Sequence, residues 1–202
     1  MKILITGAAG QIGSGLSKLL IENGHDLTLV DNLRNGYLEN LKDDANEVIA
    51  PFYEVDITSG EFFLQCGDQY DVIIHLAAIT SLPDCESNPL ETLRINVSGT
   101  ANVLEFAREF NVPHVIFAST SAIYENNDTD VFTEDLEVNP RLYYSLSKKM
   151  SEELIHSYRE NYGMTVTILR FFNVFALMET RQDLIHHYLT LHTENIHMIK
   201  HQ

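Results

Sequence analysis

The sequence is poor in basic residues, in cysteine and in long apolar runs, and each shortage excludes a class of protein. Lysines and arginines number 13 against 29 aspartates and glutamates, which gives a net charge of −16 over 202 residues. So acidic a chain repels phosphate backbones and anionic lipid headgroups, and we therefore expect neither nucleic acid nor a membrane surface as a partner. A small phosphorylated ligand stays compatible with this charge, because local backbone dipoles can hold it.

The two cysteines, Cys66 and Cys85, belong to no metal-binding or redox motif. Their spacing favours free thiols in a reducing compartment. The apolar run at residues 3–5 is too short for a signal peptide, and no apolar stretch approaches the length that spans a membrane. We therefore expect a cytoplasmic protein without a bound metal.

Short apolar runs alternate with amphipathic segments along the chain. The runs predict strands at residues 2–6, 26–30, 48–55, 71–75, 114–118 and 164–169, and the amphipathic segments predict helices at 11–23, 91–110 and 144–162. This alternation is typical of a parallel sheet covered by helices on both faces. The predicted fold class is therefore α/β, a doubly wound parallel sheet, with a polar surface loop at 125–141.

Three glycines follow the first predicted strand at a spacing that suits a pyrophosphate. Gly7, Gly10 and Gly13 frame this turn, and Gln11 and Ile12 open the predicted helix. The first glycine permits a tight turn, the second lets the backbone approach a phosphate, and the third lets helix and strand pack closely. The N–H groups and the dipole at the start of the helix then attract the phosphates.

An acidic residue stands where such a loop needs a partner for the adenosine ribose. Asp31 lies at the end of the second predicted strand, 24 residues after Gly7. A carboxylate there accepts hydrogen bonds from the ribose hydroxyls and repels a 2′-phosphate, so it predicts NAD rather than NADP. Arg34 is close enough to soften that preference.

A second group of residues carries acid–base chemistry. Tyr144 and Lys148 are four residues apart in a predicted helix and so share one face. A neighbouring ammonium stabilises a phenolate, which lets a tyrosine act as a base nearer neutral pH. Ser119, Thr120 and Ser121 supply hydroxyl groups at the end of the fifth predicted strand, where ligands bind in such sheets.

Taken together, these motifs resemble the extended short-chain dehydrogenase/reductase family, the NAD-dependent epimerases and dehydratases, over about residues 1–176. The resemblance implies a Rossmann fold with NAD as its cofactor. The residues that it places at the cofactor are Gly7, Gly10, Gln11, Ile12, Gly13, Asp31, Asn32, Asp56, Ile57, Leu76, Ala77, Ala78, Asn96, Ser119, Tyr144, Lys148 and Phe171. Those that it places at the substrate are Thr80, Thr120 and Asn173.

The residues around the catalytic hydroxyl sort the chemistry within this family. Sugar 4,6-dehydratases resemble Thr-Asp-Glu there, and decarboxylase-like members resemble Thr-Ser-Glu. This chain has Thr120-Ser121-Ala122, without a carboxylate, which disfavours elimination and favours 4-epimerisation of a nucleotide sugar, a UDP-sugar by resemblance, through a transient 4-keto intermediate.

The resemblance also implies roles for single residues. Tyr144 is the expected base and then acid, Lys148 holds the ribose and lowers the pKa of the tyrosine, and either Thr120 or Ser121 binds the C4 oxygen. Two alternatives stay open. One is that the chain is a reductase or dehydratase of the same family, and the other is that it is an NAD-binding module without catalysis.

The sequence departs from the family pattern in three places. Glu125 replaces a glycine, Ala176-Leu177 replaces Gly-Pro, and family members continue beyond the position of Gln202 into a substrate-binding region. We therefore expect residues 1–176 to form the NAD-binding domain and 177–202 to start a substrate-binding region that is otherwise largely missing. The last part of the chain contains four histidines, His186, His187, His192 and His197. Their spacing favours a solvated helix over a zinc site.

The two long predicted helices carry more apolar residues than one buried face needs. Phe106 and Phe110 add to the first, and Met150, Leu154, Ile155, Tyr158 and Tyr162 add to the second. The surplus predicts a homodimer in which these helices form a four-helix bundle.

Overall fold

The computed structural model describes residues 1–129 and 131–174, and within them six parallel strands form one sheet in the order β3-β2-β1-β4-β5-β6. The strands are β1 (Lys2–Thr6), β2 (Asp26–Asp31), β3 (Phe52–Glu54), β4 (Val72–His75), β5 (His114–Thr120) and β6 (Thr165–Phe171). The predicted doubly wound parallel sheet is confirmed. The order of the strands reverses between β1 and β4, and ligands bind at the carboxyl edge beside such a reversal.

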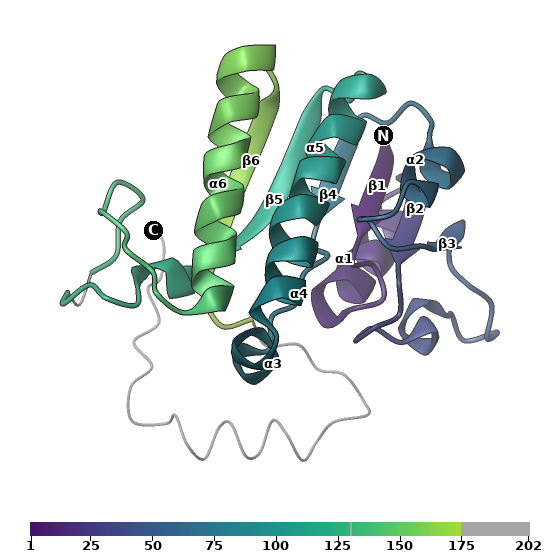
Figure 1. The fold of residues 1–202 in the computed structure, drawn as a ribbon. Coiled ribbons are helices and arrows are strands. Elements are labelled where there is room, and N and C mark those ends of the chain that lie inside the picture. The colour runs from purple at the N-terminus through teal and green to yellow at the C-terminus, as the bar shows by residue number, and fades with distance from the viewer. Residues whose placement is uncertain (130, 175–202) are drawn as a thin grey trace.

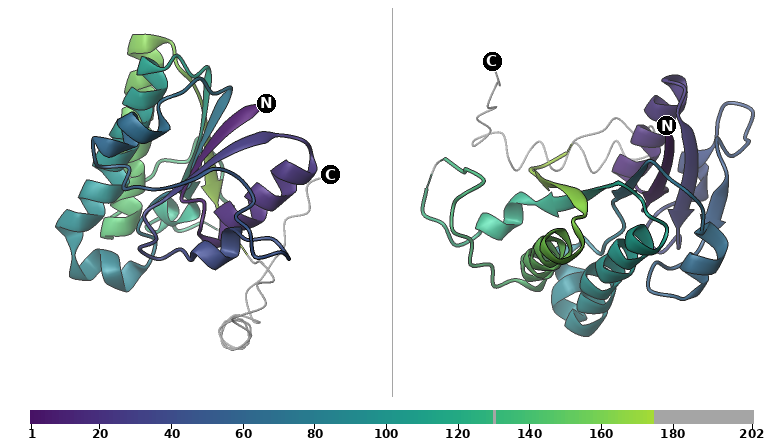
Figure 2. Two further views of the ribbon diagram at one scale, coloured as in Figure 1. Left: turned by 90° about the vertical axis from the view of Figure 1, so that its right-hand side faces the viewer. Right: turned by 90° about the horizontal axis from the view of Figure 1, so that it is seen from above.

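Helices cover both faces of this sheet (Figure 1, Figure 2). One face carries α1 (Gln11–Glu22) and the short turn η1 (Leu38–Leu41), and the other carries α2 (Glu61–Cys66), α5 (Gly99–Glu109) and α6 (Tyr143–Tyr162). Ile3 and Ile5 belong to the core under α1, whereas Leu4 between them belongs to the core under α5 and α6. Alternate residues of a strand point to opposite faces, so apolar residues at consecutive positions fill both cores.

The long helix predicted at 91–110 is interrupted in the structure. It divides into α4 (Pro89–Leu93), a π-helical turn η2 (Arg94–Ser98) and α5. The extra residue in a π turn releases a carbonyl from the regular ladder. Here the carbonyl of Asn96 accepts hydrogen bonds from the hydroxyls of Thr100 at 2.5 Å and Ser151 at 2.9 Å. The three segments follow one another without a gap, which is why the pattern predicted one helix.

Other differences occur where elements are short. The third strand spans three residues rather than eight, because the sheet edge pairs only from Phe52 onward. The six-residue helices α2 and α3 (Leu82–Ser87) have too few turns to show a periodicity, and the short turn η3 (Ser121–Tyr124) follows β5. In α1 the apolar pattern of Ile12, Leu16, Leu19 and Leu20 predicts one buried face. Leu16 and Leu20 do pack against the core, but Leu19 is 55% exposed, and the small residues Ser14 and Ser17 are buried.

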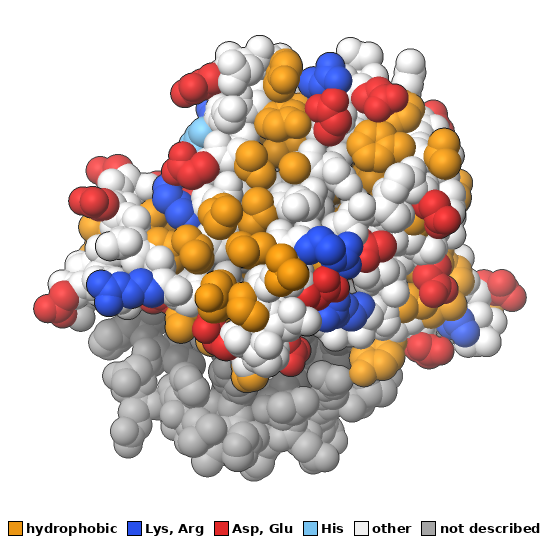
Figure 3. Space-filling model, viewed as in Figure 1, with side chains coloured by type: hydrophobic (Ala, Val, Ile, Leu, Met, Phe, Trp, Pro, Cys, Tyr) orange, Lys and Arg blue, Asp and Glu red, His pale blue; other side chains and the backbone are white. Residues whose placement is uncertain are grey.

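Some of the apolar residues assigned to a dimer surface lie in the core instead. Phe106 is fully buried, with its ring centroid 4.7 Å from that of Phe62 and 4.6 Å from that of Phe110. Ile155 is fully buried too. Apolar side chains still gather on the outer face of α4, α5 and α6 (Figure 3), where Leu90 and Met150 are 80% and 40% exposed. Of the residues predicted to supply this surplus, Met150 and Tyr162 are exposed, and Leu90, which was not predicted, adds to them.

Candidate active site

The loop after β1 meets the loop after β4 at the reversal of the strand order. Gly7 has φ +73°, and a Cβ there would lie 2.6 Å from the backbone nitrogen of Ala77. A Cβ at Gly13 would lie 2.7 Å from the Cα of Ala8. Neither position accepts a larger residue. At Gly10 a Cβ would lie 3.3 Å from the carbonyl oxygen of Gly7, a tight contact that a small shift relieves, so packing alone restricts this position less than it restricts Gly7 and Gly13.

The start of α1 is open to an anion. Gly10 is the N-cap residue and offers no side chain to the first turn, in which Gln11 is exposed and Ile12 is half-buried. The N–H groups of a first helical turn have no partner inside the helix. Together with the helix dipole they suit the phosphates of a dinucleotide.

Asp31 ties this loop to the end of β2. Its Oδ2 accepts the N–H of Ala9 at 3.0 Å and its Oδ1 accepts the N–H of Leu33 at 2.8 Å. Burial raises the pKa of the Asp31 carboxyl, against the lowering effect of these backbone hydrogen bonds. Each carboxylate oxygen keeps a lone pair for a further donor, as the ribose hydroxyls of a dinucleotide require. Asn40, which the motifs did not reveal, fixes the same loop through a hydrogen bond from Nδ2 to the carbonyl of Ala9 at 2.9 Å.

The residues predicted for the adenine side lie next to Asp31. The Nδ2 of Asn32 donates to Asp56 Oδ2 at 3.4 Å. Partial burial favours a higher pKa for Asp56, but hydrogen bonds from Thr58 and the charge of Arg94 outweigh it and lower the pKa. Ile57 is buried and its carbonyl accepts a hydrogen bond from Asn102. Arg94 was not predicted, because it is 38 residues from Asp56 along the chain and nothing in the sequence shows that the two meet.

The segment after β4 is held from below by a buried histidine. The Nδ1 of His75 lies 2.7 Å from Thr6 Oγ1 and its Nε2 lies 3.1 Å from Thr100 Oγ1. Burial lowers the pKa of His75 to about 3, so this imidazole is a neutral part of the scaffold. The predicted cofactor residues Leu76, Ala77 and Ala78 follow it and are half-buried, and the predicted substrate residue Thr80 is exposed beyond them.

Asn96 joins that segment to α6. Its Oδ1 accepts the N–H of Ile79 at 2.8 Å, and its Nδ2 donates to the carbonyl of Ile79 at 3.0 Å and to Ser147 Oγ at 2.9 Å. Ser147 directly precedes Lys148. The side chain of Asn96 is therefore buried and fixes the backbone beside Lys148.

The hydroxyl that meets the tyrosine belongs to Thr120. The Thr120 hydroxyl lies close enough to that of Tyr144 to lower the pKa of the phenol, and Thr120 Oγ1 accepts the N–H of Ala122 at 3.1 Å. Ser121 lies in η3 and is half-buried. Of the two hydroxyls left open by the sequence, the geometry favours Thr120. The third, on Ser119, donates to the buried Glu152 at 2.5 Å, which directs it toward α6.

Lys148 is buried beneath this pair. Its Nζ donates to the carbonyl of Ala118 at 2.8 Å and lies 4.8 Å from the ring centroid of Phe117. Burial lowers the pKa of Lys148 to about 8. The sequence predicts that Lys148 lowers the pKa of Tyr144, but in the structure, which holds only protein atoms, this pKa is not lowered. Burial raises that pKa against the lowering effect of Thr120, and no hydrogen bond joins Tyr144 to Lys148 among the described residues.

A buried ion pair supports the strand end from the other side. Glu152, one helical turn after Lys148, is fully buried and pairs with Arg170 at 2.8 Å. Arg170 also donates to the hydroxyl of Tyr124 at 2.7 Å. Beyond this pair, Phe171 ends β6 opposite Thr120 and is half-buried, and Asn173 is exposed at the same edge of the sheet. Ala176-Leu177 and the four tail histidines lie outside the described residues.

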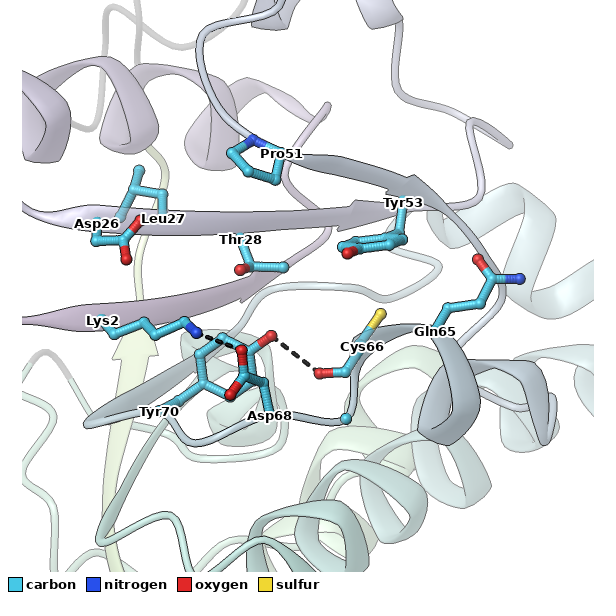
Figure 4. A pocket seen from close by; sticks show the side chains of 11 residues that line it. Lys2, Asp26, Leu27, Thr28, Pro51, Tyr53, Gln65, Cys66, Asp68 and Tyr70 are labelled. Carbon is cyan, nitrogen blue, oxygen red and sulfur yellow. Dashed lines mark hydrogen bonds and ion pairs between the residues drawn. The ribbon is translucent and has the colours of Figure 1, made fainter.

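A separate hollow lies at the opposite, amino edge of the strands (Figure 4). It has a volume of about 250 Å³ and is lined in part by Lys2, Thr28, Cys66 and Tyr70. Its polar groups are already paired. Lys2 pairs with Asp68, and the Tyr70 hydroxyl donates to the carbonyl of Cys66. Within the described residues no group of His, Cys, Asp and Glu is arranged to hold a metal ion, and no helix is both long and apolar enough to cross a membrane.

The sheet, the open helix start and the Thr120–Tyr144–Lys148 group define a dinucleotide-dependent enzyme fold of the Rossmann class. The model of the NAD dependent epimerase/dehydratase family matches residues 3–200. The chain belongs to this family, and its cofactor is NAD. The observed cradle fits that group: Gly10 and the first turn of α1 suit the pyrophosphate, and Asp31 suits the ribose.

Three similar proteins place the chain more closely. The UDP-glucuronate 4-epimerase of Thermodesulfobacterium geofontis is 34% identical over 184 residues, which are 86% of this chain and 56% of that protein. The UDP-glucose 4-epimerase of Thermotoga maritima, solved with UDP-glucose, is 33% identical with a TM-score of 0.79 and 87% and 57% of the chains covered. The Thermus thermophilus UDP-glucose 4-epimerase, solved with NAD, is 30% identical with a TM-score of 0.81 and 90% and 58% covered. The chain thus spans little more than half of the length of each.

Proposed function

We propose that the protein inverts the configuration at C4 of a nucleotide sugar, a UDP-sugar by analogy with its relatives. The observation that carries the proposal is the placement of Thr120, Tyr144 and Lys148 together at the carboxyl end of β5, at the same edge of the sheet as the Gly7–Ala77 contact that shapes the NAD cradle. Relatives that share this fold are named as UDP-sugar 4-epimerases.

The chain's own groups suit the proton transfers of this reaction. When bound, NAD accepts a hydride from C4 and returns it within one catalytic cycle. Tyr144 takes the proton of the C4 hydroxyl and gives it back to the C4 oxygen once the hydride has returned to the opposite face of the turned keto-sugar, while the Thr120 hydroxyl orients that oxygen. A proton on Lys148 favours the phenolate electrostatically. Because Lys148 has a pKa of about 8, it is still mostly protonated at neutral pH.

The surroundings of Thr120 favour epimerisation over elimination. Loss of water from a sugar needs an acid and a base near the reacting carbons. The positions that follow Thr120 hold Ser121 and Ala122, and the Ala122 N–H donates to Thr120 itself. A reductase or dehydratase of the same family, and an NAD-binding module without catalysis, remain the alternatives against which the proposal is tested.

We also propose the division of the chain and its setting. Residues 1–176 form the NAD-binding domain, and 177–202 begin the region that binds the sugar nucleotide. The two cysteines are free and buried, which supports a reducing compartment such as the cytoplasm.

A homodimer through α5 and α6 is a further part of this proposal. Leu90 and Met150 are its exposed apolar contacts, whereas Leu154 packs against the core. Light scattering at micromolar concentration should give twice the chain mass. Met150→Glu should yield monomers, and Leu19→Glu, an exposed leucine on the other face, should not. A wild-type chain that stays monomeric on concentration would refute the dimer.

The function is tested with protein shown to hold NAD. Incubated with UDP-glucose or UDP-galactose, the chain should interconvert the two without net change in absorbance at 340 nm. Tyr144→Phe should keep NAD and lose turnover. Net production of NADH would indicate a dehydrogenase, and absence of turnover with UDP-glucose, UDP-N-acetylglucosamine and UDP-glucuronate would favour the NAD-binding module.

A further inference from the structure

Arg34 is held by a carboxylate from a distant helix. Its Nη1 donates to Glu91 Oε1 at 2.7 Å, across a separation of 57 residues. Glu91 also accepts from Arg94, through Nε at 2.7 Å and Nη2 at 3.0 Å. One carboxylate of α4 thus lies between two guanidinium groups. Among the described residues, Glu91 is the sole hydrogen-bond partner of the Arg34 guanidinium.

The backbone conformation after β2 fixes the position of Arg34 relative to Asp31 and Asn32. The Leu33 N–H donates to Asp31 and the Arg34 N–H donates to Asn32 Oδ1 at 3.1 Å. Between them, Leu33 has φ +54°, a left-handed conformation that is costly for a residue other than glycine. Two side-chain hydrogen bonds and this turn therefore set Arg34 immediately beyond the pair that faces the adenosine ribose.

An arginine near the ribose edge is the residue type that accommodates the 2′-phosphate of NADP. We propose that Glu91 is a determinant of the preference for NAD, because it engages Arg34 and so withholds from a 2′-phosphate the cation nearest to it. Discrimination is then shared. Asp31 repels the extra phosphate, and Glu91 neutralises the group that would attract it. The inference rests on NAD as cofactor and is independent of the sugar chemistry.

Arg94 does not compete for this role. It donates to Asp56 at 3.4 Å and to the hydroxyl of Thr58 as well as to Glu91, so it stays attached to the adenine side without Glu91. Arg34 lacks such a second anchor in the described part of the chain. Its side chain is 42% exposed and that of Glu91 is 25% exposed, and such a pair is weak enough for a change of one charge to free the arginine.

The test measures binding rather than activity. The full chain is freed of nucleotide, and the dissociation constants of NAD and NADP are determined by calorimetric titration for the wild type, Glu91→Gln, Arg34→Ala and the double variant. Glu105→Gln, which removes the charge from a similar pair with Arg108 on α5, is the control. Glu91→Gln should lower the ratio of the NADP to the NAD constant about fivefold, which corresponds to the ~1 kcal/mol that an exposed ion pair can contribute.

The arginine variants decide whether the effect passes through Arg34. Arg34→Ala alone should leave the ratio within about twofold of the wild type, since the arginine is already engaged, and in the Glu91→Gln background it should restore the wild-type ratio. An unchanged ratio in Glu91→Gln, or a gain that survives in the double variant, would overturn the proposal. So would a large rise of the ratio in Arg34→Ala alone, or loss of NAD binding in Glu91→Gln while Glu105→Gln binds normally.

Discussion

The Glu125 carboxylate accepts a hydrogen bond from the hydroxyl of Ser145 at 2.9 Å. Glu125 follows η3 and therefore the Thr120 strand end, and Ser145 adjoins Tyr144 in the first turn of α6. The same carboxylate accepts the N–H groups of Arg141 and Leu142. The N-cap residue of α6, Leu142, offers no side-chain cap of its own. Glu125, which stands where the family pattern has a glycine, thus caps α6 and joins its first turn to the segment that follows the Thr120 strand end.

Removing this cap should destabilise the start of α6. Glu125→Ala should lower the free energy of unfolding by about 1 kcal/mol, the usual cost of a lost helix cap. Glu137→Ala, in the same polar loop, removes a carboxylate that bonds to no other described residue and should change stability little. Urea unfolding of the three proteins measures both effects. Equal losses for the two variants would show that Glu125 does not act as a cap.

Gly7 and Gly24 allow the cost of a positive φ to be distinguished from the cost of a close contact. Both have positive φ, but a Cβ at Gly24 would meet nothing within 4 Å, whereas one at Gly7 would meet the backbone of Ala77. Gly24→Ala should cost ~1 kcal/mol of stability and leave NAD binding unchanged. Gly7→Ala should be less stable than Gly24→Ala and should bind NAD roughly tenfold more weakly or worse, because the displaced loop loses at least one hydrogen bond to phosphate. Similar NAD affinities for the two variants would contradict this geometry.

The buried lysine predicts an unusual dependence of stability on pH. Lys148 has a pKa of about 8 in the folded chain against an ordinary value of 10.5. Below pH 8 both states carry the proton, and the cost of burying the charge is present in full. Between these values the folded chain loses its proton first, so that cost falls as the pH rises.

The variant Lys148→Met removes the ionisable group. It should be more stable than the wild type at pH 7, and the difference should shrink by ~3 kcal/mol toward pH 10, since each unit of pKa corresponds to about 1.4 kcal/mol. Unfolding at pH 7, 8.5 and 10 measures the change, with Lys149→Met as the control for the loss of a lysine. A difference that is constant with pH would show that Lys148 is not perturbed in the fold.

The cofactor side of the site could be predicted from sequence because its residues are close to one another along the chain. Gly7, Gly13 and Asp31 follow buried strands whose apolar runs are plain, and the strand pattern alone places them at one edge. The strand-ending hydroxyls and the Tyr144 helix were found for the same reason. Spacing could not choose between Thr120 and Ser121, since that choice depends on the turn in which β5 ends.

The supporting contacts could not be predicted, because they join residues far apart in the sequence. Glu91 meets Arg34, and Glu152 meets Ser119 and Arg170, only after the sheet is assembled. The effect of Lys148 on the pKa of Tyr144 could not be predicted for another reason. The spacing of the two residues is as predicted, but it gives no measure of burial, and burial governs the pKa of both side chains.

The fate of the hydrogen on C4 tests the proposed epimerisation most directly. The chain, loaded with NAD, is incubated in ordinary water with UDP-glucose that carries deuterium at C4, and the product is analysed by mass spectrometry and NMR. If the hydride is withdrawn and returned inside one closed site, UDP-galactose should form with the deuterium still at C4 and none in the solvent. UDP-galactose without the label, or label accumulating in released NADH, would contradict the account.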